Sequence, residues 1–195
     1  MKTIAIYGAN GHGKVVADIA MSNGYDEVIF IDDGDNPYLN FEEYVKLYKY
    51  PIALGIGKNS IRKMVYEKIK AQNLEVKTLI HLKSIVAKDV ILKEGVVIMP
   101  GVIVNTGSTI GAGSILNTSS VIDHDCVIGD FVHIAPNSTL AGDVCVKEMT
   151  FVGIGSSIIQ GKTIGKNSIV GAGSVVIKDI PDNVLAYGVP AKVMK

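Results

Sequence analysis

The sequence predicts two domains of different architecture: a small α/β domain over residues 1–82, followed by an all-β domain, a parallel β-helix, over residues 83–195. Two observations support this prediction. The first part alternates short apolar runs with helical patterns, which is typical of a parallel sheet covered by helices. The second part has an aliphatic residue at every sixth position, a period that neither an α-helix nor an ordinary sheet shows.

In the first domain we expect strands over residues 3–7, 27–31, 52–56 and 75–80, and helices over residues 14–21 and from about 58 to 69. The longer connection over residues 34–50 has room for one further helix. Alternation of this kind predicts a small parallel sheet, with each helix crossing from one strand to the next.

The six-residue period of the second domain continues without a break from Ile98 to Val176. Four positions after most of these aliphatic residues stands a small side chain such as Ser114 or Cys126. The aliphatic positions are Ile98, Val104, Ile110, Leu116, Ile122, Ile128, Ile134, Leu140, Val146, Val152, Ile158, Ile164, Val170 and Val176. We expect the aliphatic residue to point into a prism and the small residue to fill the corner beside it, so that three hexads close one coil of about 18 residues.

The coils are expected to begin near Ile85 and to end at residues 178–181. The tail beyond them, over residues 187–192, is too short for another coil. An open β-helix end exposes unpaired strand edges. We therefore expect the α/β domain to cover one end and the tail to fold back along the other.

Composition argues against several classes of partner. The 195 residues carry 19 basic and 19 acidic side chains, so the formal net charge is zero, and Arg62 is the only arginine. Broad attraction to nucleic acid or to an anionic membrane is therefore not expected. The N-terminus has too short an apolar run for a signal peptide, no transmembrane run follows, and Cys126 and Cys145 are not in a metal-like spacing. We expect a cytoplasmic protein without a metal.

A glycine-rich turn joins the first strand to the first helix, with the sequence Gly8-Ala-Asn-Gly-His-Gly13. Such a turn lets backbone N–H groups at a helix N-terminus approach a phosphate. Asp32 and Asp33 follow about twenty residues later at the end of the second strand, where an acidic side chain meets a ribose hydroxyl. The alternative is a purely steric role for the glycines. A Rossmann-like domain of about 80 residues is long enough for a mononucleotide half only, which favours a nucleoside diphosphate over NAD.

The candidate substrate contacts in this domain are therefore Asn10, Gly11, His12, Gly13, Asp32, Asp33 and Gly57. His12 is interpreted as a phosphate contact, a substrate contact or a packing residue at the helix start. Gly57 begins the next helix and offers a second backbone contact. Lys58 and Arg62 on that helix are either further contacts or solvated side chains.

Within the repeat, His124 is a polar residue that the prism does not need. Acidic residues flank it, Asn117 lies one hexad earlier, and His133 follows about one and a half hexads later. A histidine beside a carboxylate such as Asp125 is the arrangement of a general base, because the carboxylate orients the ring and stabilises its charged form. A surface histidine is the alternative. Metal binding is not expected, because His124 and His133 should lie on different faces of the prism.

Several motifs resemble one known family. They are YGANGHGKVV at residues 7–16, FIDD at 30–33, GIGKNSIRK at 55–63, LNTSSVIDHDCVIGDFVHIAP at 116–136 and YGVPAK at 187–192. Together with the hexad repeat, they resemble the bacterial left-handed β-helix sugar O- and N-acetyltransferases, related to the sialic acid O-acetyltransferase and the acetyltransferase of bacillosamine synthesis. The segment around His124 is most similar to the enzymes that acetylate the 4-amino group of UDP-4-amino-4,6-dideoxy-N-acetylglucosamine.

The resemblance implies left-handed coils and a homotrimer, with acetyl-CoA as co-substrate in the groove between neighbouring prisms. It implies His124 as the catalytic base and Asp125 as the carboxylate that raises its basicity, where the bacillosamine enzymes carry Glu. It implies nucleotide-sugar contacts at Gly11, His12, Asp32, Asp33 and Gly57, and acetyl-CoA contacts at His133, Gly142, Ile154 and Ala172. We add Asn10, Gly13 and Asn117 as candidate substrate contacts.

The expected reaction is direct attack of the amine of a UDP-linked amino sugar on the thioester, with His124 removing the proton and the Gly142 N–H stabilising the oxyanion. Alternatives within the same fold are an O-acetyltransferase of sialic acid and an N-acetyltransferase of another nucleotide amino sugar, such as a GDP-linked perosamine. Outside this class, the alternatives are a non-catalytic trimeric scaffold with a nucleotide sensor and an NAD-dependent dehydrogenase.

Overall fold

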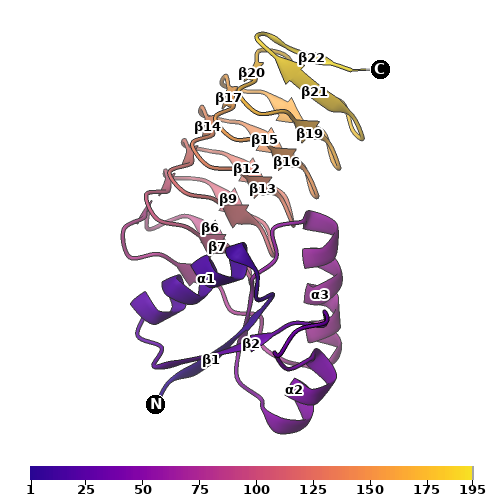
Figure 1. Cartoon of the computed structure of the whole chain (residues 1–195). Helices are drawn as coiled ribbons and strands as arrows, with labels where there is room; N and C mark the ends of the chain where they lie inside the picture. Colours follow the sequence, from indigo (N-terminus) through magenta and orange to yellow (C-terminus); the bar gives the residue numbers. More distant parts are fainter. Residues whose placement is uncertain (195) are drawn as a thin grey trace.

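In the computed structural model, which describes residues 1–194, the α/β domain lies across one end of a β-helix, and the C-terminus lies at the other end (Figure 1). Both predicted domain types are therefore confirmed. No helix in these residues is long and apolar enough to cross a bilayer.

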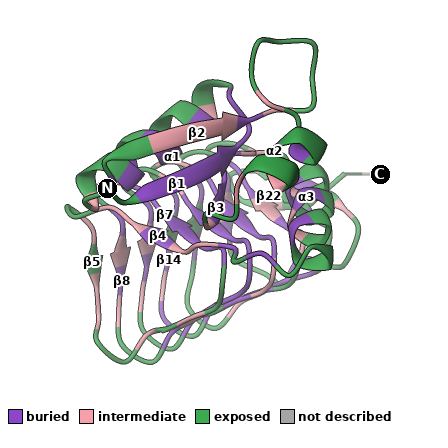
Figure 2. Cartoon of the chain, turned by 90° about the horizontal axis from the view of Figure 1, so that it is seen from below, coloured by how far each residue is buried: buried purple, intermediate pink, exposed green. Residues whose placement is uncertain are grey.

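The α/β domain has a three-stranded parallel sheet in the order β2-β1-β3, in which the central strand β1 is buried along its whole length (Figure 2). The predicted helix within residues 34–50 is present as α2, whereas α1 begins at Gly11, three residues earlier than predicted. Gly11 and Gly13 are therefore in the first turn of α1, whereas Gly8 precedes the helix. The elements are β1 (Thr3–Tyr7), α1 (Gly11–Ser22), β2 (Glu27–Ile31), α2 (Phe41–Leu47), β3 (Ile52–Leu54) and α3 (Asn59–Ala71).

The fourth strand predicted for this sheet belongs to the β-helix instead. β4 (Leu79–Ile80) pairs in parallel with β7, and Val76 makes only an isolated bridge to Ile52. The coils therefore begin at Leu79 rather than near Ile85. An apolar run predicts that a strand forms but does not identify the strand with which it pairs. The partner of β4 lies 18 residues later in the chain.

The β-helix has three faces, each built from two-residue strands stacked at one position of successive coils. The first face contains β4, β7, β10, β13, β16 and β19, the second β5, β8, β11, β14, β17 and β20, and the third β6, β9, β12, β15 and β18. The strands are β5 (Ile85–Val86), β6 (Ile91–Leu92), β7 (Val97–Ile98), β8 (Ile103–Val104), β9 (Thr109–Ile110), β10 (Ile115–Leu116), β11 (Val121–Ile122), β12 (Val127–Ile128), β13 (His133–Ile134), β14 (Thr139–Leu140), β15 (Cys145–Val146), β16 (Phe151–Val152), β17 (Ser157–Ile158), β18 (Thr163–Ile164), β19 (Ile169–Val170) and β20 (Val175–Val176).

The aliphatic hexad residues form the core of the prism, as predicted. All fourteen are at most 2% exposed, and the small corner residues, including Cys126, are buried beside them. Corner hydroxyls link successive coils: Ser114 Oγ donates to Gly129 O at 2.8 Å and accepts from Val132 N at 3.0 Å. The buried hydroxyls therefore satisfy backbone groups that the corners leave unpaired.

From Gly95 to Gly173, each corner turns through a residue with positive φ, and these residues lie six positions apart. Most of these residues are Gly, Asn, Asp or Ser, but Phe131 (φ 56°) and Met149 (φ 64°) carry larger side chains. Large side chains are uncommon in this conformation. Both residues lie where the α/β domain meets the β-helix: the Phe131 and Met149 carbonyls accept hydrogen bonds from α3.

The tail folds back as predicted. β21 (Leu185–Gly188) extends the first face beside β19, and β22 (Ala191–Val193) returns antiparallel to it. This hairpin ends the first face with an antiparallel strand instead of another coil.

Candidate active site

The carboxyl ends of the three parallel strands form one side of a cleft of about 390 Å³, here called the sheet-edge cleft. In an open α/β sheet, ligands bind at this edge. Five of the predicted substrate contacts line the cleft: Asn10, His12, Asp32, Asp33 and Gly57. Apolar side chains of α3 form the opposite wall, among them Ile61 and Met64, which are 40% and 59% exposed.

The two predicted ribose contacts are held by the protein itself. Asp32 accepts hydrogen bonds from Ala9 N (3.0 Å), Gly34 N (3.0 Å) and the Asn36 side chain (2.9 Å). A carboxylate has about four acceptor positions. Asp32 therefore ties the glycine turn to the end of β2 and keeps about one acceptor position for a ligand.

Asp33 has a different set of partners. Its carboxylate accepts from Tyr7 Oη (2.5 Å), from Lys68 Nζ (2.7 Å) and from the Phe41 N–H (2.9 Å). Desolvation opposes ionisation, but the hydrogen bonds from Lys68, Tyr7 and Phe41 together lower the pKa of Asp33. The carboxylate is therefore ionised at neutral pH and oriented from three sides.

Two helices begin at the cleft without a side-chain cap. Neither α1, with N-cap Asn10, nor α3, with N-cap Lys58, has a capping hydrogen bond or an acidic residue in its first turn. In contrast, α2 has a capping box made by Asn40 and Glu43. A helix N-terminus carries free N–H groups and a partial positive charge. The two uncapped ends therefore favour an anion at the cleft.

The glycines of the turn differ in role. A Cβ at Gly13 would lie 1.8 Å from Gly8 O, and a Cβ at Gly8 would lie 2.7 Å from Gly55 O. Gly8 and Gly13 are therefore required for close packing of the turn against the sheet. Neither Gly11 nor Gly13 lines the cleft, although no atom would contact a Cβ at Gly11; Gly57 lines it and is equally open.

His12 and His133 meet where the two domains join, with ring centroids 6.3 Å apart. Burial, together with the charge of Arg62, lowers the pKa of each histidine to about 4, so both rings are neutral at pH 7. His133 Nδ1 lies 3.2 Å from Gly57 O and its Nε2 3.0 Å from Asn117 Nδ2. Because a carbonyl only accepts, Nδ1 carries the proton and Nε2 accepts from Asn117. His12 Nε2 is buried without a partner in residues 1–194.

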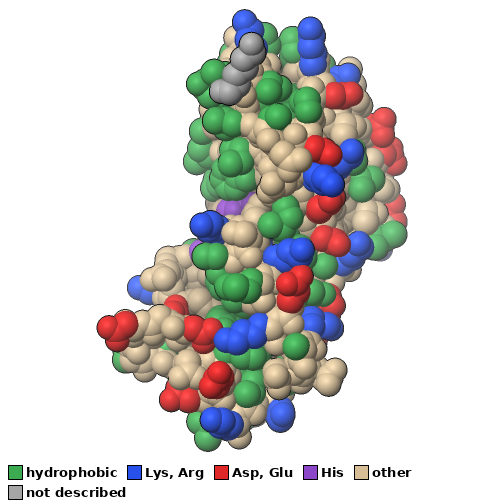
Figure 3. Space-filling model, turned by 90° about the vertical axis from the view of Figure 1, so that its right-hand side faces the viewer, with side chains coloured by type: hydrophobic (Ala, Val, Ile, Leu, Met, Phe, Trp, Pro, Cys, Tyr) green, Lys and Arg blue, Asp and Glu red, His purple; other side chains and the backbone are tan. Residues whose placement is uncertain are grey.

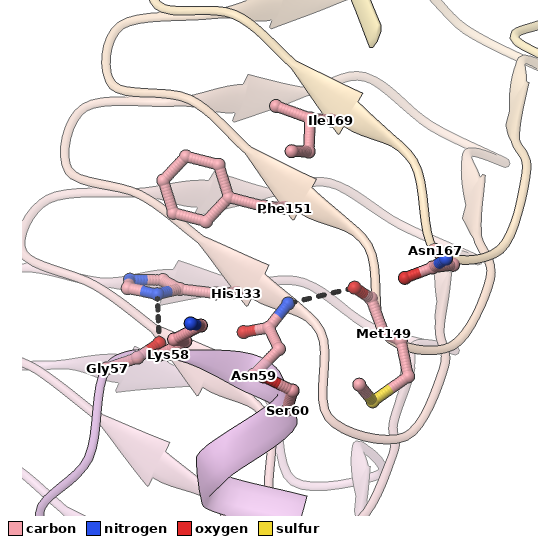
Figure 4. Close-up of a pocket in the computed structure, with 9 residues that line it drawn as sticks. All are labelled: Gly57, Lys58, Asn59, Ser60, His133, Met149, Phe151, Asn167 and Ile169. Carbon is pink, nitrogen blue, oxygen red and sulfur yellow. Dashed lines mark hydrogen bonds between the residues drawn. The ribbon is translucent and has the colours of Figure 1, made fainter. Parts of the chain in front are cut away.

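A second cleft, here called the junction cleft, lies beside these histidines and has a volume of about 560 Å³ (Figure 4). The start of α3 forms one wall and the first face of the β-helix forms the other, where the His133 and Phe151 rings meet edge to face. Gly57 lines both clefts. Histidine side chains are visible in the hollow between the two domains (Figure 3).

Arg62 is the residue that the sequence interpretation missed. It was expected to be a ligand contact or a solvated side chain, but it is 0% exposed and lines neither cleft. Its guanidinium donates to Gly113 O (2.6 Å) and Phe131 O (3.0 Å) in the β-helix and to Gly57 O (2.8 Å) in the α/β domain. Arg62 therefore joins the two domains. Lys58, in contrast, is exposed at the junction cleft.

His124 and Asp125 lie at the corner between the second and third faces, where the chain turns from β11 to β12. Asp125 has a positive φ of 59°, a conformation that Asp tolerates, and its Oδ2 lies 2.9 Å from His124 Nδ1. The carboxylate only accepts, so Nδ1 carries the proton and Nε2 has the free lone pair. The hydrogen bond to Asp125 and the charges of Asp123 and Asp143 raise the pKa of His124.

Gly142 lies one coil above this pair. A Cβ there would be 2.5 Å from Cε1 and Nε2 of His124, so only glycine leaves room for the imidazole in its present position. Within residues 1–194 the Gly142 N–H donates to no protein acceptor. A free N–H beside a histidine Nε2 can donate to an oxygen that develops negative charge.

One chain does not bring all the predicted residues together. Asn117, Ile154 and Ala172 lie at the corner between the first and second faces, whereas His124 and Gly142 lie at the corner between the second and third. The second face separates these two corners. His124 also lines neither the sheet-edge cleft nor the junction cleft.

Comparisons with known proteins match both halves of the chain. Residues 3–69 match the family model of the PglD N-terminal domain, and residues 107–142 match that of the bacterial transferase hexapeptide (six repeats). The perosamine N-acetyltransferase of Caulobacter crescentus, solved with CoA and GDP-perosamine, is 35% identical with a TM-score of 0.95, over 100% of this chain and 98% of that one. The chain belongs to the hexapeptide-repeat sugar N-acetyltransferase family.

Two further relatives are similar to the chain over different extents. The acetyltransferase domain of PglB from Neisseria gonorrhoeae is 34% identical with a TM-score of 0.92, and both chains are covered completely. The same domain has been solved with acetyl coenzyme A. The curated galactoside O-acetyltransferase of Lactococcus lactis is 36% identical over 91 residues, which are 37% of this chain and 44% of that protein. The match thus covers less than half of that curated relative's length.

Proposed function

We propose that this protein transfers the acetyl group of acetyl-CoA to the amino group of a nucleotide-linked amino sugar, with His124 as the general base. The His124–Asp125 pair carries the proposal, because it combines a proton-bearing Nδ1 held at 2.9 Å from Asp125 with a free Nε2. The nucleotide binds in the sheet-edge cleft, with its diphosphate at the uncapped N-termini of α1 and α3 and its ribose at Asp32 or Asp33.

In this mechanism, the sugar amine attacks the thioester carbonyl directly while Nε2 of His124 takes the proton. The Gly142 N–H donates to the oxyanion, and collapse of the intermediate expels the CoA thiolate, which takes the proton from His124 and leaves as the thiol. An acyl-enzyme on Cys126 has no support: the thiol is 0% exposed, and burial raises its pKa. Alignment of amine and thioester supplies most of the remaining rate enhancement.

The reaction requires a homotrimer in this proposal. The His124–Gly142 corner of one prism would face the Asn117, Ile154 and Ala172 corner of its neighbour, with acetyl-CoA in the groove between them. The separation of these corners within one chain supports this arrangement.

The first candidate acceptor is UDP-4-amino-4,6-dideoxy-N-acetylglucosamine, and GDP-perosamine is the second. The resemblance around His124 favours the first, and the similarity to the C. crescentus enzyme favours the second. The test measures acetyl-CoA consumption with both, with a dTDP-linked amino sugar, and with free and CMP-linked sialic acid. Turnover with one nucleotide amino sugar alone would support the proposal; turnover with sialic acid alone would overturn the acceptor class.

The role of His124 has its own test. His124→Ala should lower kcat by about 10²- to 10⁴-fold, the usual size of a general-base contribution. Binding of acetyl-CoA and of the nucleotide sugar, measured by calorimetry, should change little. Near-normal turnover by this variant would exclude His124 as the base.

A further inference from the structure

The buried side chain of Arg62 has a full set of hydrogen bonds. All of its N–H donors are engaged: Nε with Gly113 O, Nη1 with Ile56 O (3.2 Å) and Gly57 O (2.8 Å), and Nη2 with Asn59 Oδ1 and Phe131 O. None of these acceptors is a carboxylate. Burial lowers the pKa of Arg62 only to about 9, so the buried guanidinium is charged at neutral pH, with no paired anion among residues 1–194.

Two of these bonds fix the orientation of two successive peptide groups. In a planar trans peptide, the C=O and the N–H point in opposite directions. Because Arg62 holds the Ile56 and Gly57 carbonyls on its own side, the N–H groups of Gly57 and Lys58 point away from it. Neither N–H donates to a protein acceptor within residues 1–194.

These N–H groups lie at the partition between the two clefts. Gly57 lines both the sheet-edge cleft and the junction cleft, and a Cβ at Gly57 would meet no atom within 4 Å. The surface above this peptide is therefore open to a ligand. Two adjacent free N–H groups at the start of a helix, with a cation behind them, form an anion-binding subsite.

We propose that Arg62 is a positioning residue that turns the Gly57 and Lys58 N–H groups toward the clefts, so that they bind the diphosphate of the nucleotide sugar. This inference rests on the proposed function, because it takes the nucleotide as the ligand of the sheet-edge cleft. Arg62 touches no substrate; it acts through the peptides that it orients and through its unpaired charge. The geometry requires the planar fork of arginine, since one nitrogen reaches both carbonyls while the others bind the β-helix.

The test compares the affinities of ligands that differ only in phosphate number. UDP, UMP and uridine, and in parallel GDP, GMP and guanosine, are titrated into the full-length wild-type protein and into Arg62→Met, Arg62→Lys and Lys63→Met. Calorimetry serves for the nucleotides, and ligand-observed NMR serves for the weaker nucleosides. Lys63→Met is the matched control, because it removes one positive charge from the same helix at an exposed side chain.

We expect Arg62→Met to weaken binding of the diphosphate by roughly tenfold or more, binding of the monophosphate by less, and nucleoside binding by less than about twofold. Arg62→Lys should weaken binding of the three ligands in the same order but by smaller factors. It replaces Arg62→Met as the test variant if Arg62→Met does not fold. Lys63→Met should leave all three affinities within about twofold of wild type.

Two results would overturn the inference. Equal weakening of all three ligands would show that Arg62 serves only to join the domains, and unchanged diphosphate affinity would show that the orientation of the peptides does not depend on it. If the wild-type protein bound neither nucleoside diphosphate, the proposed acceptor class would fail and the inference with it. If the wild-type protein binds the diphosphate and the variants bind it equally well, the role of Arg62 is refuted but the proposed acceptor class is not.

Discussion

At the scale of single residues, the proposed chemistry depends on the protonation of His124. The hydrogen bond to Asp125 raises the pKa of the imidazole, followed by the charge of Asp123. A general base acts in its unprotonated form, so activity should fall as the pH drops through this raised pKa. The Asp125 carboxylate therefore makes Nε2 a stronger base but moves the acid limb of the pH profile upward.

Asp125→Asn should shift the acid limb of kcat/KM to lower pH, because the largest cause of the raised pKa is removed. It should also lower the plateau rate, since an amide can hold the ring in the wrong tautomer. The measurement is a pH profile of kcat/KM for both proteins. An acid limb at the same pH in the variant would mean that His124 does not titrate in it.

Gly142 gives a steric test of the same site. Gly142→Ala would place a methyl group 2.5 Å from the His124 ring in its present position, so the imidazole must move away. We expect kcat to fall by about tenfold or more, because misplacement of the base by about 1 Å costs up to 10²-fold. Thermal unfolding should change little, because the ring is exposed and can move. An unchanged kcat would show that the present ring position is not the reactive one.

The residue scale also shows what the sequence can predict. His124 and Asp125 could be chosen because the repeat does not need them. Arg62 was harder to place, because the apolar residues Ile61 and Met64 on the same helix do not mark its buried side. Those two side chains are exposed at the cleft, and the buried stripe of α3 is Arg62, Val65 and Ile69. That stripe has helical spacing, so an arginine in line with buried positions was the available signal.

At the scale of elements, the hexad period predicted nearly every strand because each residue of the repeat has one role, in the core or at a corner. The elements of the α/β domain were harder to predict from the sequence. α1 begins among the glycines, where Gly13 packs closely against Gly8 and Gly55, and β4 pairs with β7, 18 residues later. The first difference arises from a contact between elements, which local sequence does not encode. The second could have been read from the sequence, because Ile80, Val86 and Leu92 continue the six-residue period back from Ile98.

The corner hydroxyls allow a paired stability test. Ser114→Ala leaves Gly129 O and Val132 N without their buried partner, which should cost about 1–3 kcal/mol of unfolding free energy. Ser120 is equally buried, but its Oγ has no partner within residues 1–194, so Ser120→Ala should leave stability unchanged or raise it by about 1 kcal/mol. Urea unfolding at one fixed protein concentration measures both. Equal losses in the two variants would contradict the proposed role of the coil-linking hydroxyls.

At the scale of the whole molecule, the sheet-edge cleft and the His124 corner lie on different parts of one chain. In the proposed function, a reaction that uses both takes His124 from one chain and the cleft from its neighbour. A ring of three such heterologous contacts closes into a trimer with three shared sites. Sequence periodicity predicts the prism but not which of its corners meet, because the pairing depends on the shape of the assembled faces.

Complementation between two inactive variants tests this shared site. His124→Ala removes the base, and Gly57→Phe fills the cleft from a position where a Cβ meets no protein atom. If each site uses both chains, unfolding and refolding an equal mixture should restore about one quarter of wild-type activity, since that fraction of neighbours pairs an intact base with an intact cleft. An equal mixture of wild type and the double variant should also reach about one quarter of wild-type activity. If the site lay within one chain, that mixture would reach about one half, and the mixture of the two single variants would have no activity. Recovery in the first mixture therefore decides whether the active site is shared, and its absence would place the whole reaction within one chain.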